Sequence, residues 1–163
     1  MSRAHHSRGF TLVELMIVLT LLSVLAFIAI PSFTEFTRAN RVQATAEELK
    51  AFLVAARTEA LNNRAPVIVK ITAAEWEIRD NQDKKLRILE LDPQPQVTSL
   101  NSLTELKYTA NGTAELGGRP ARFTVCYEQD TKNGHMISVQ PSGAVRLYPK
   151  GRNDSNATLS SCQ

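Results

Sequence analysis

The stretch RGFTLVEL at residues 8–15 joins a short basic leader to a long apolar segment. Between Phe10 and Ile30 the only charged residue is Glu14. A helix of about 20 mostly apolar residues is long enough to cross the hydrocarbon core of a bilayer. A carboxylate inside such a segment is costly and is by default a functional residue. The sequence therefore predicts a membrane-spanning helix that carries one functional acid near its start.

Two common kinds of N-terminal segment explain these residues incompletely. A cleaved secretory signal has a shorter apolar run followed by a small-x-small site, and no Ala-x-Ala tripeptide occurs within or just after residues 10–30. An ordinary signal anchor fits the length and the basic flank, because positive residues stay cytoplasmic. It leaves Glu14 unexplained, since an acid deep in such a helix costs roughly 2.5–3.5 kcal/mol on insertion scales.

The motif GFTLVEL at residues 9–15 resembles the processing and assembly motif of type IV pilins and type II secretion pseudopilins. The resemblance implies that a prepilin peptidase cleaves after Gly9 and that the new N-terminal residue, Phe10, is N-methylated. It also implies that Glu14 pairs with the N-terminal amine of a neighbouring subunit. Such a pair would give the acid a partner in a low-dielectric bundle and would set the subunit register. Pro31 falls where such helices often carry a proline that kinks or loosens the backbone.

Beyond Pro31 the sequence becomes amphipathic, with apolar residues that recur at steps of three and four. This spacing predicts one face of a helix docked on a sheet. Asn62-Asn63 and Ala65-Pro66 form a stop signal, so we expect the helix to run from about Phe10 to Leu61. The apolar residues of this face are Val42, Ala46, Leu49, Leu53, Ala56 and Ala60.

After Pro66 the sequence changes to short apolar or alternating runs that predict β-strands. Asn111-Gly112 is a hairpin signal, and residues 92–96 are expected to be an irregular connection. The expected strands are 67–71, 76–79, 86–89, 106–108, 113–116, 123–127, 136–139 and 145–148. The predicted fold class is α+β: a long N-terminal helix, its first half transmembrane, packed on an antiparallel β-sandwich-like head. This is a type IV pilin-like fold.

The resemblance extends to the end of the long helix, where ARTEA at residues 56–60 is similar to an element of the H-type pseudopilin and FimT group, which includes FimU-like minor pilins. It implies three regions: a leader at 1–9, a transmembrane and assembly helix at 10–31, and a globular head at 32–163. The implied function is that of a minor type IV pilin, which joins a minor-pilin complex that primes or caps the pilus in adhesion, twitching motility or DNA uptake. The alternatives are the H-type pseudopilin of a type II secretion system and a DNA-binding minor pilin for natural transformation.

The same resemblance implies a location and partners. The precursor would be a single-pass protein of the bacterial inner membrane with a periplasmic head, later incorporated into a pilus or pseudopilus. Its partners would be the inner membrane, the prepilin peptidase, and other minor and major pilins or pseudopilins.

Two cysteines, Cys126 and Cys162, occur in the sequence. In an exported domain they predict one disulfide that holds the C-terminal tail. Closing a loop of this size contributes roughly 3–4 kcal/mol in the chain-entropy model. The alternative is a pair of free thiols in a cytosolic domain, which the export-type N-terminus disfavours.

Charge and motif content argue against several other functions. The formal net charge is +3 from 19 basic and 16 acidic residues, and removing Arg3 and Arg8 with the leader leaves 17 against 16. So small a net charge does not indicate nucleic-acid binding. The sequence lacks a nucleophile elbow, a P-loop, a dinucleotide fingerprint and a metal signature, so we expect neither enzymatic activity nor a cofactor. Asp80, Asp83 and Glu90 are expected to be solvated surface.

The C-terminal tail contains the remaining candidate site. Basic residues with an interleaved aromatic suit phosphate contacts and base stacking, and Arg146, Tyr148, Lys150 and Arg152 have this composition. They are a possible DNA or partner site. Some FimT-type proteins bind DNA through a Gly-Arg-x-Arg motif, whereas residues 151–154 here end in an acid, Gly-Arg-Asn-Asp. A solubilising tail held by Cys162 is the favoured interpretation.

Overall fold

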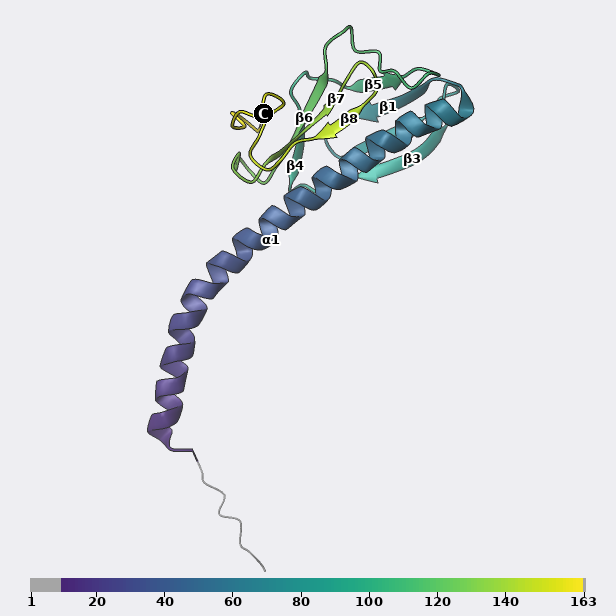
Figure 1. Ribbon diagram of the computed structural model, residues 1–163. Coiled ribbons are helices and arrows are strands. Elements are labelled where there is room, and N and C mark those ends of the chain that lie inside the picture. The colour runs from purple at the N-terminus through teal and green to yellow at the C-terminus, as the bar shows by residue number, and fades with distance from the viewer. Residues whose placement is uncertain (1–9, 163) are drawn as a thin grey trace, which may run out of the picture. The chain divides into compact units, whose positions relative to one another are not determined.

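The computed structural model describes residues 10–162, except for the side chain of Ile28. One helix, α1 (Leu12–Asn63), precedes the strands (Figure 1). The strands are β1 (Val67–Ile71), β2 (Glu75–Arg79), β3 (Lys85–Glu90), β4 (Gln96–Ser99), β5 (Glu105–Tyr108), β6 (Ala121–Cys126), β7 (His135–Val139) and β8 (Val145–Leu147). The chain divides into two compact units between Thr37 and Arg38, a few residues beyond the boundary expected at Pro31.

The first unit is the N-terminal half of α1, which has no apolar cover of its own. Its exposed large apolar side chains range from Val18, which is 40% exposed, to Phe27, which is 84% exposed. A segment of 18 residues in α1 has a mean hydropathy of 2.7, and none of it is buried. The helix continues through Pro31, which has no N–H to donate to the preceding turn.

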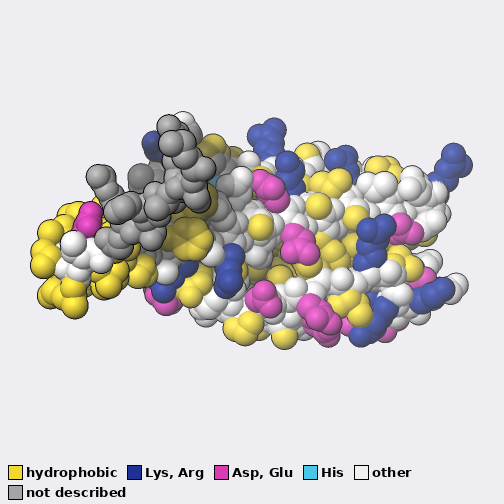
Figure 2. Space-filling model, turned by 90° about the horizontal axis from the view of Figure 1, so that it is seen from below, with side chains coloured by type: hydrophobic (Ala, Val, Ile, Leu, Met, Phe, Trp, Pro, Cys, Tyr) yellow, Lys and Arg dark blue, Asp and Glu magenta, His cyan; other side chains and the backbone are white. Residues whose placement is uncertain are grey.

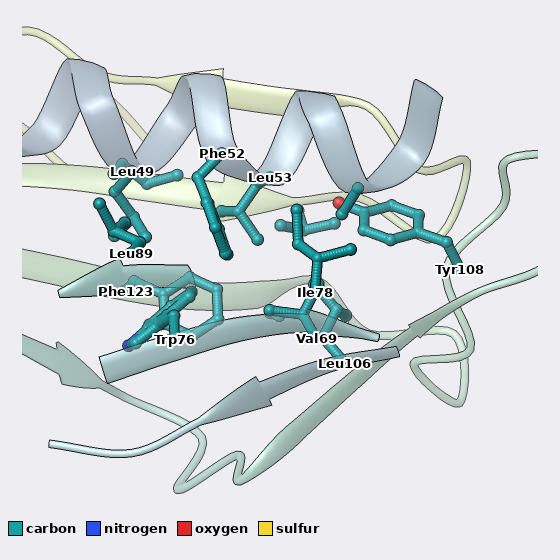
Figure 3. Close-up of a cluster of buried hydrophobic side chains, with 14 of the residues drawn as sticks. Leu49, Phe52, Leu53, Val69, Trp76, Ile78, Leu89, Leu106, Tyr108 and Phe123 are labelled. Carbon is teal, nitrogen blue, oxygen red and sulfur yellow. The ribbon is translucent and has the colours of Figure 1, made fainter. Parts of the chain in front are cut away.

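The second unit is the head, and the C-terminal half of α1 forms one side of its core. The predicted apolar face is confirmed, because its six members, Val42, Ala46, Leu49, Leu53, Ala56 and Ala60, are all fully buried. Figure 3 shows Leu49, Phe52 and Leu53 directed from the helix toward side chains of the strands. The helical period therefore specified which face of α1 packs against the sheets.

The strands form two four-stranded antiparallel sheets, β3-β2-β1-β5 and β4-β6-β7-β8. The expected antiparallel, two-sheet arrangement on the helix is confirmed. Trp76 of β2 and Phe123 of β6 meet edge to face, with ring centroids 4.9 Å apart. This contact joins the two sheets within the main core (Figure 3).

The strand β4 was not predicted. Gln96 was assigned to an irregular connection, but it begins a strand that pairs with β6 and places Val97 opposite Val125. The strand has four residues with a single apolar side chain, Val97, so no alternating pattern marks it in the sequence. Hydrogen bonding to the buried strand β6 therefore stabilises β4 as a strand, although its own sequence has no strand pattern.

The prediction of a strand at residues 113–116 was wrong. The structure has an isolated bridge between Tyr108 and Ala114, with hydrogen bonds from the Thr109 N–H to the Thr113 carbonyl and from the Glu115 N–H to the Lys107 carbonyl on either side of it. The residues turn away after Glu115, so no continuous pairing forms. The hairpin turn expected at Asn111-Gly112 does form, with the Gly112 N–H bonded to the Thr109 carbonyl at 2.8 Å.

Arg57, the arginine of the ARTEA element, joins α1 to turns from both sheets. Its Nε donates to the Gly112 carbonyl at 3.0 Å and its Nη2 donates to the Ser142 carbonyl at 3.2 Å. The two turns approach so closely that a Cβ on Gly143 would lie 1.8 Å from the Gly112 oxygen. Gly143 also has a φ of +79°, which favours glycine. Arg57 therefore connects α1 to a turn from each of the two sheets at one end of the head.

Candidate assembly site

The predicted acid, Glu14, lies in the first turn of α1. Thr11 precedes the helix and caps it: its Oγ1 accepts a hydrogen bond from the Glu14 N–H at 3.2 Å, and its carbonyl accepts one from the Leu15 N–H at 3.1 Å. The Thr11 hydroxyl also lies 3.5 Å from Glu14 Oε2 and can donate to it. Thr11 is therefore the N-cap, with Glu14 three residues later.

Thr11 was not among the predicted site residues, although the sequence contained a signal for it. A threonine followed three residues later by glutamate, just before an apolar run, is the capping-box pattern. The negative charge of Glu14 is also favourable at this end of the helix, where the macrodipole is positive. The structure thus assigns Glu14 a local role at the helix start while leaving its side chain exposed.

The other polar side chains of this segment are satisfied within the helix. Thr20 Oγ1 donates to the carbonyls of Met16 and Ile17 at 3.0 and 2.8 Å, and Ser23 Oγ donates to the Thr20 carbonyl at 2.8 Å. These bonds satisfy the hydroxyl donors within the helix, so that they need no partner in an apolar environment. Within residues 10–30, Glu14 is left as the one side chain that calls for a charged partner.

The predicted cleavage junction is partly outside the described residues. Gly9 lies outside them, whereas Phe10 is described and is 74% exposed. Phe10 precedes the helix, which begins at Leu12. Peptidase cleavage and methylation at this junction remain predictions.

The predicted cysteine pair forms a disulfide in the head. Cys126, the last residue of β6, is joined to Cys162 across a sequence separation of 36 residues, with a Cα–Cα distance of 5.9 Å. Both residues are buried, together with Met136 and Leu159, in a small cluster separate from the main core. The disulfide therefore holds the C-terminal segment against β6 and β7.

The four candidate DNA-contacting residues lie near one another in sequence but in different environments. Arg146 and Lys150 are exposed, whereas Arg152 donates to the Asn156 carbonyl at 3.1 Å. Tyr148 packs against the disulfide cluster and its hydroxyl lies 3.2 Å from Ser138 Oγ. Its ring is thus engaged within the head rather than presented for base stacking.

The acid that ends the Gly-Arg-Asn-Asp sequence has a partner that sequence reasoning missed. Arg122 of β6 contacts Asp154 Oδ2 through Nε and Nη2, each at 2.6 Å. The two residues are 32 positions apart, and no local sequence pattern connects them. Asp154 therefore neutralises a cation of the head.

The expected solvated carboxylates have specific partners. Asp83 pairs with Lys70 at 3.1 Å and with Arg79 at 2.8 Å; hydrogen bonds from Lys70, then from Arg79, hold the pKa of Asp83 below its usual value. Hydrogen bonds from Lys85, then from Arg79, likewise lower the pKa of Glu77. These groups form a charge network on one sheet. Acidic and basic side chains are interspersed on the face of the head in Figure 2.

No group of three histidine, cysteine, aspartate or glutamate residues within 10–162 is arranged to hold a metal ion. Asp80 is occupied by its own turn, since Oδ1 accepts the N–H groups of Gln82 and Lys84 at 2.9 Å each. Glu90 lies opposite Glu75 in the β2–β3 ladder. The part of the chain that the structure describes thus presents an uncovered apolar helix with a capped acid, and a head tied together by ion pairs and a disulfide.

A long N-terminal helix on antiparallel sheets is the type IV pilin fold, and known structures share it. The structure is similar to that of the type IV minor pilin FimU from Pseudomonas aeruginosa, with a TM-score of 0.65 and 25% sequence identity over 78% of this chain and 99% of that one. The family model of the type II transport protein GspH matches residues 45–143, which is more than half of the chain. The chain belongs to the GspH family and is a FimT/FimU-like member of the type IV pilin group.

The N-terminal segment has its own matches. The model of the prokaryotic N-terminal methylation motif matches residues 4–30. A fimbrial protein of Pseudomonas aeruginosa is 39% identical over 57 residues, which cover 35% of this chain and only 37% of that protein. The type IV major alpha-pilin of Moraxella bovis is 25% identical over 151 residues, covering 88% of this chain and 92% of the pilin.

Proposed function

We propose that this chain is a minor type IV pilin, a structural subunit that joins a minor-pilin complex that primes or caps the pilus. The observation that carries the proposal is the uncovered apolar segment at residues 10–30, in which Glu14 is the only charged residue. A helix with such a surface needs a membrane or other apolar helices around it. The likeness of the head to FimU supports a pilus subunit.

The proposed route to the filament has three steps. The precursor inserts in the bacterial inner membrane with its basic leader in the cytoplasm and its head in the periplasm, as the positive-inside rule requires. A prepilin peptidase then cleaves between Gly9 and Phe10, and Phe10 is N-methylated. The disulfide Cys126–Cys162 supports a periplasmic head, since such bonds persist in oxidising compartments.

Glu14 is the proposed assembly residue. Its carboxylate would pair with the N-terminal amine that a neighbouring subunit acquires by cleavage. Within a helix bundle of low dielectric, that pairing offsets the cost of each charge and fixes the stagger between the two helices. Thr11 holds the first turn of α1, so the carboxylate starts from a defined position.

The test compares Glu14→Ala with Glu35→Ala, which removes an exposed acid from the same helix beyond Pro31. Removing one partner of a buried ion pair costs about 3–5 kcal/mol, or roughly a hundredfold or more in an equilibrium. On immunoblots, the amount of the Glu14→Ala protein in a sheared pilus fraction should therefore fall at least about tenfold. Its amount in the membrane should be unchanged. Glu35→Ala should match the unmodified protein. Normal incorporation of Glu14→Ala would refute the mechanism.

The second candidate is the H-type pseudopilin of a type II secretion system, and the GspH family match over residues 45–143 favours it. Both candidates use the same helix and the same acid, so Glu14→Ala does not separate them. Deletion of the gene does. Loss of surface pili with normal protein export would support the minor pilin, whereas loss of export with normal pili would support the pseudopilin.

A further inference from the structure

Residues 149–162, here called the strap, cover the outer face of the sheet β4-β6-β7-β8. Alternate residues of β6 and β7 point to opposite faces, and Phe123 and Ile137 belong to the main core. Cys126 and Met136, on the other face, are buried instead by Leu159 and Cys162 of the strap. The strap thus has its own small apolar cluster, which does not merge with the main core.

The strap is folded within itself. Its residues form a small hairpin closed by the bridge Arg152–Thr158 and by hydrogen bonds from the Ser155 and Ala157 N–H groups to Asn153 Oδ1, at 3.0 and 2.9 Å. The Leu159 N–H also bonds to the Gly151 carbonyl at 2.9 Å. Because these bonds are local, they can persist when the strap leaves the sheet.

Three of the attachments of the strap to the rest of the head are a hydrogen bond, an ion pair and a disulfide. The Gly151 N–H donates to the Gly134 carbonyl at 2.8 Å, and Asp154 pairs with Arg122 at 2.6 Å. The third attachment is the disulfide between Cys126 and Cys162. The ion pair is partly exposed, so solvent and salt weaken it, and the disulfide is the covalent lock.

An unpaired polar group lies on the same face of β6 as the residues that the strap contacts. Thr124 lies between Arg122 and Cys126 on β6 and therefore shares their face. It is fully buried, and its Oγ1 has no hydrogen-bond partner among the described residues. A buried hydroxyl without a partner is unfavourable, and hydration of that face would relieve the cost.

We propose that the strap is a redox-gated cover, which opens as one unit when the disulfide is reduced while the main core stays folded. A thiolate of an external dithiol attacks one sulfur of Cys126–Cys162 and forms a mixed disulfide, and the second thiol of the reductant resolves it. The reductant leaves as a disulfide, and Cys126 and Cys162 each end as thiols. Exchange with an external disulfide runs the step in reverse: that disulfide leaves as a dithiol, Cys126 and Cys162 are rejoined, and the cover closes.

Opening changes what the head presents. Arg122 loses Asp154, and Met136 and Thr124 become accessible to solvent. The register places Arg122 opposite Ser138 and Ser138 opposite Arg146, so these residues lie in one row across β6, β7 and β8. Opening therefore frees the guanidinium of Arg122 in the same row as the exposed Arg146. The proposed opening involves the head alone, so it does not depend on whether the chain belongs to a pilus or to a secretion system.

Hydrogen exchange measured by mass spectrometry tests the cover on the full chain in detergent, with and without dithiothreitol. After reduction, exchange in peptides from residues 149–162 should rise at least about tenfold, while peptides from β1 and β2 keep their protection. Unchanged exchange in the strap would overturn the proposal, because the disulfide would then lock nothing. Simultaneous loss of protection in β1 and β2 would also overturn it, because the strap would not be a separate unit.

A substitution in the strap gives a second readout that does not need the reduced protein to be stable. Asp154→Asn removes the ion pair to Arg122 and should speed reduction of the disulfide by dithiothreitol at least about threefold, as followed by thiol labelling, since local fluctuations of the strap, short of full opening, expose the sulfurs of the intact disulfide. Asp92→Asn is the control, because Asp92 is exposed and forms no ion pair among the described residues. Equal rates for the two variants would contradict the role of the strap.

Discussion

Arg57→Ala should destabilise the head more than its half-buried position on a helix suggests. The substitution removes two charge-assisted hydrogen bonds, to the carbonyls of Gly112 and Ser142. Bonds that involve a charged group contribute about 1.5–3 kcal/mol each. Because the bond to Ser142 is exposed, we expect a combined loss of about 2–4 kcal/mol in the free energy of unfolding. At about 4 °C per kcal/mol for a domain of this size, the midpoint of thermal unfolding should fall by about 8–16 °C.

The fluorescence of Trp76 measures this change directly. It is the only tryptophan in the chain and is 1% exposed in the main core, so its emission reports the unfolding of the head in full-length protein in detergent. Arg41→Ala is the matched control, since Arg41 is an exposed arginine of α1 and its loss should cost under about 0.5 kcal/mol. Arg57→Lys should be intermediate, because one ammonium cannot replace the planar fork. Equal midpoints for Arg57→Ala and Arg41→Ala would refute the reasoning.

Two further predictions concern the head. Gly143→Ala should lower the thermal midpoint at least as far as Arg57→Ala, because its Cβ would overlap the Gly112 oxygen and its φ is positive; an unchanged melting curve would contradict the close approach. The pKa of Glu77 is lowered in the folded state, so its stabilisation is present above the unfolded value of about 4.3 and is lost as the pH falls through the folded value. The urea midpoint of Glu77→Gln should therefore vary less with pH below about 4.3 than that of the control Glu105→Gln.

Local patterns in the sequence predicted much of the fold because each depends on a short stretch of chain. The four- and three-residue steps of α1 identified side chains such as Leu49 and Leu53 that are fully buried. The alternating runs located most strands, and β4 was missed because Val97 is its one apolar residue. Its place at the edge of the second sheet comes from pairing with β6, which a single-sequence pattern does not encode.

The acid in the apolar helix was likewise evident from the sequence. Glu14 is conspicuous because its neighbours are apolar, whereas the cap at Thr11 was not predicted although its spacing from Glu14 signals it. The cysteine pairing followed from there being only two cysteines. These conclusions required no knowledge of distant contacts.

Only the tertiary structure decided how the head is closed and covered. Arg57 meets carbonyls 55 and 85 residues away, and Arg122 meets Asp154 across 32 residues. Such contacts depend on the register of the sheets and on where the turns fall. The sequence by itself determined a helix that is long and apolar enough to span a membrane and carries one acid, since helix formation and hydrophobicity are local properties. The strap and the Arg57 contacts arise from long-range packing, which no local period specifies.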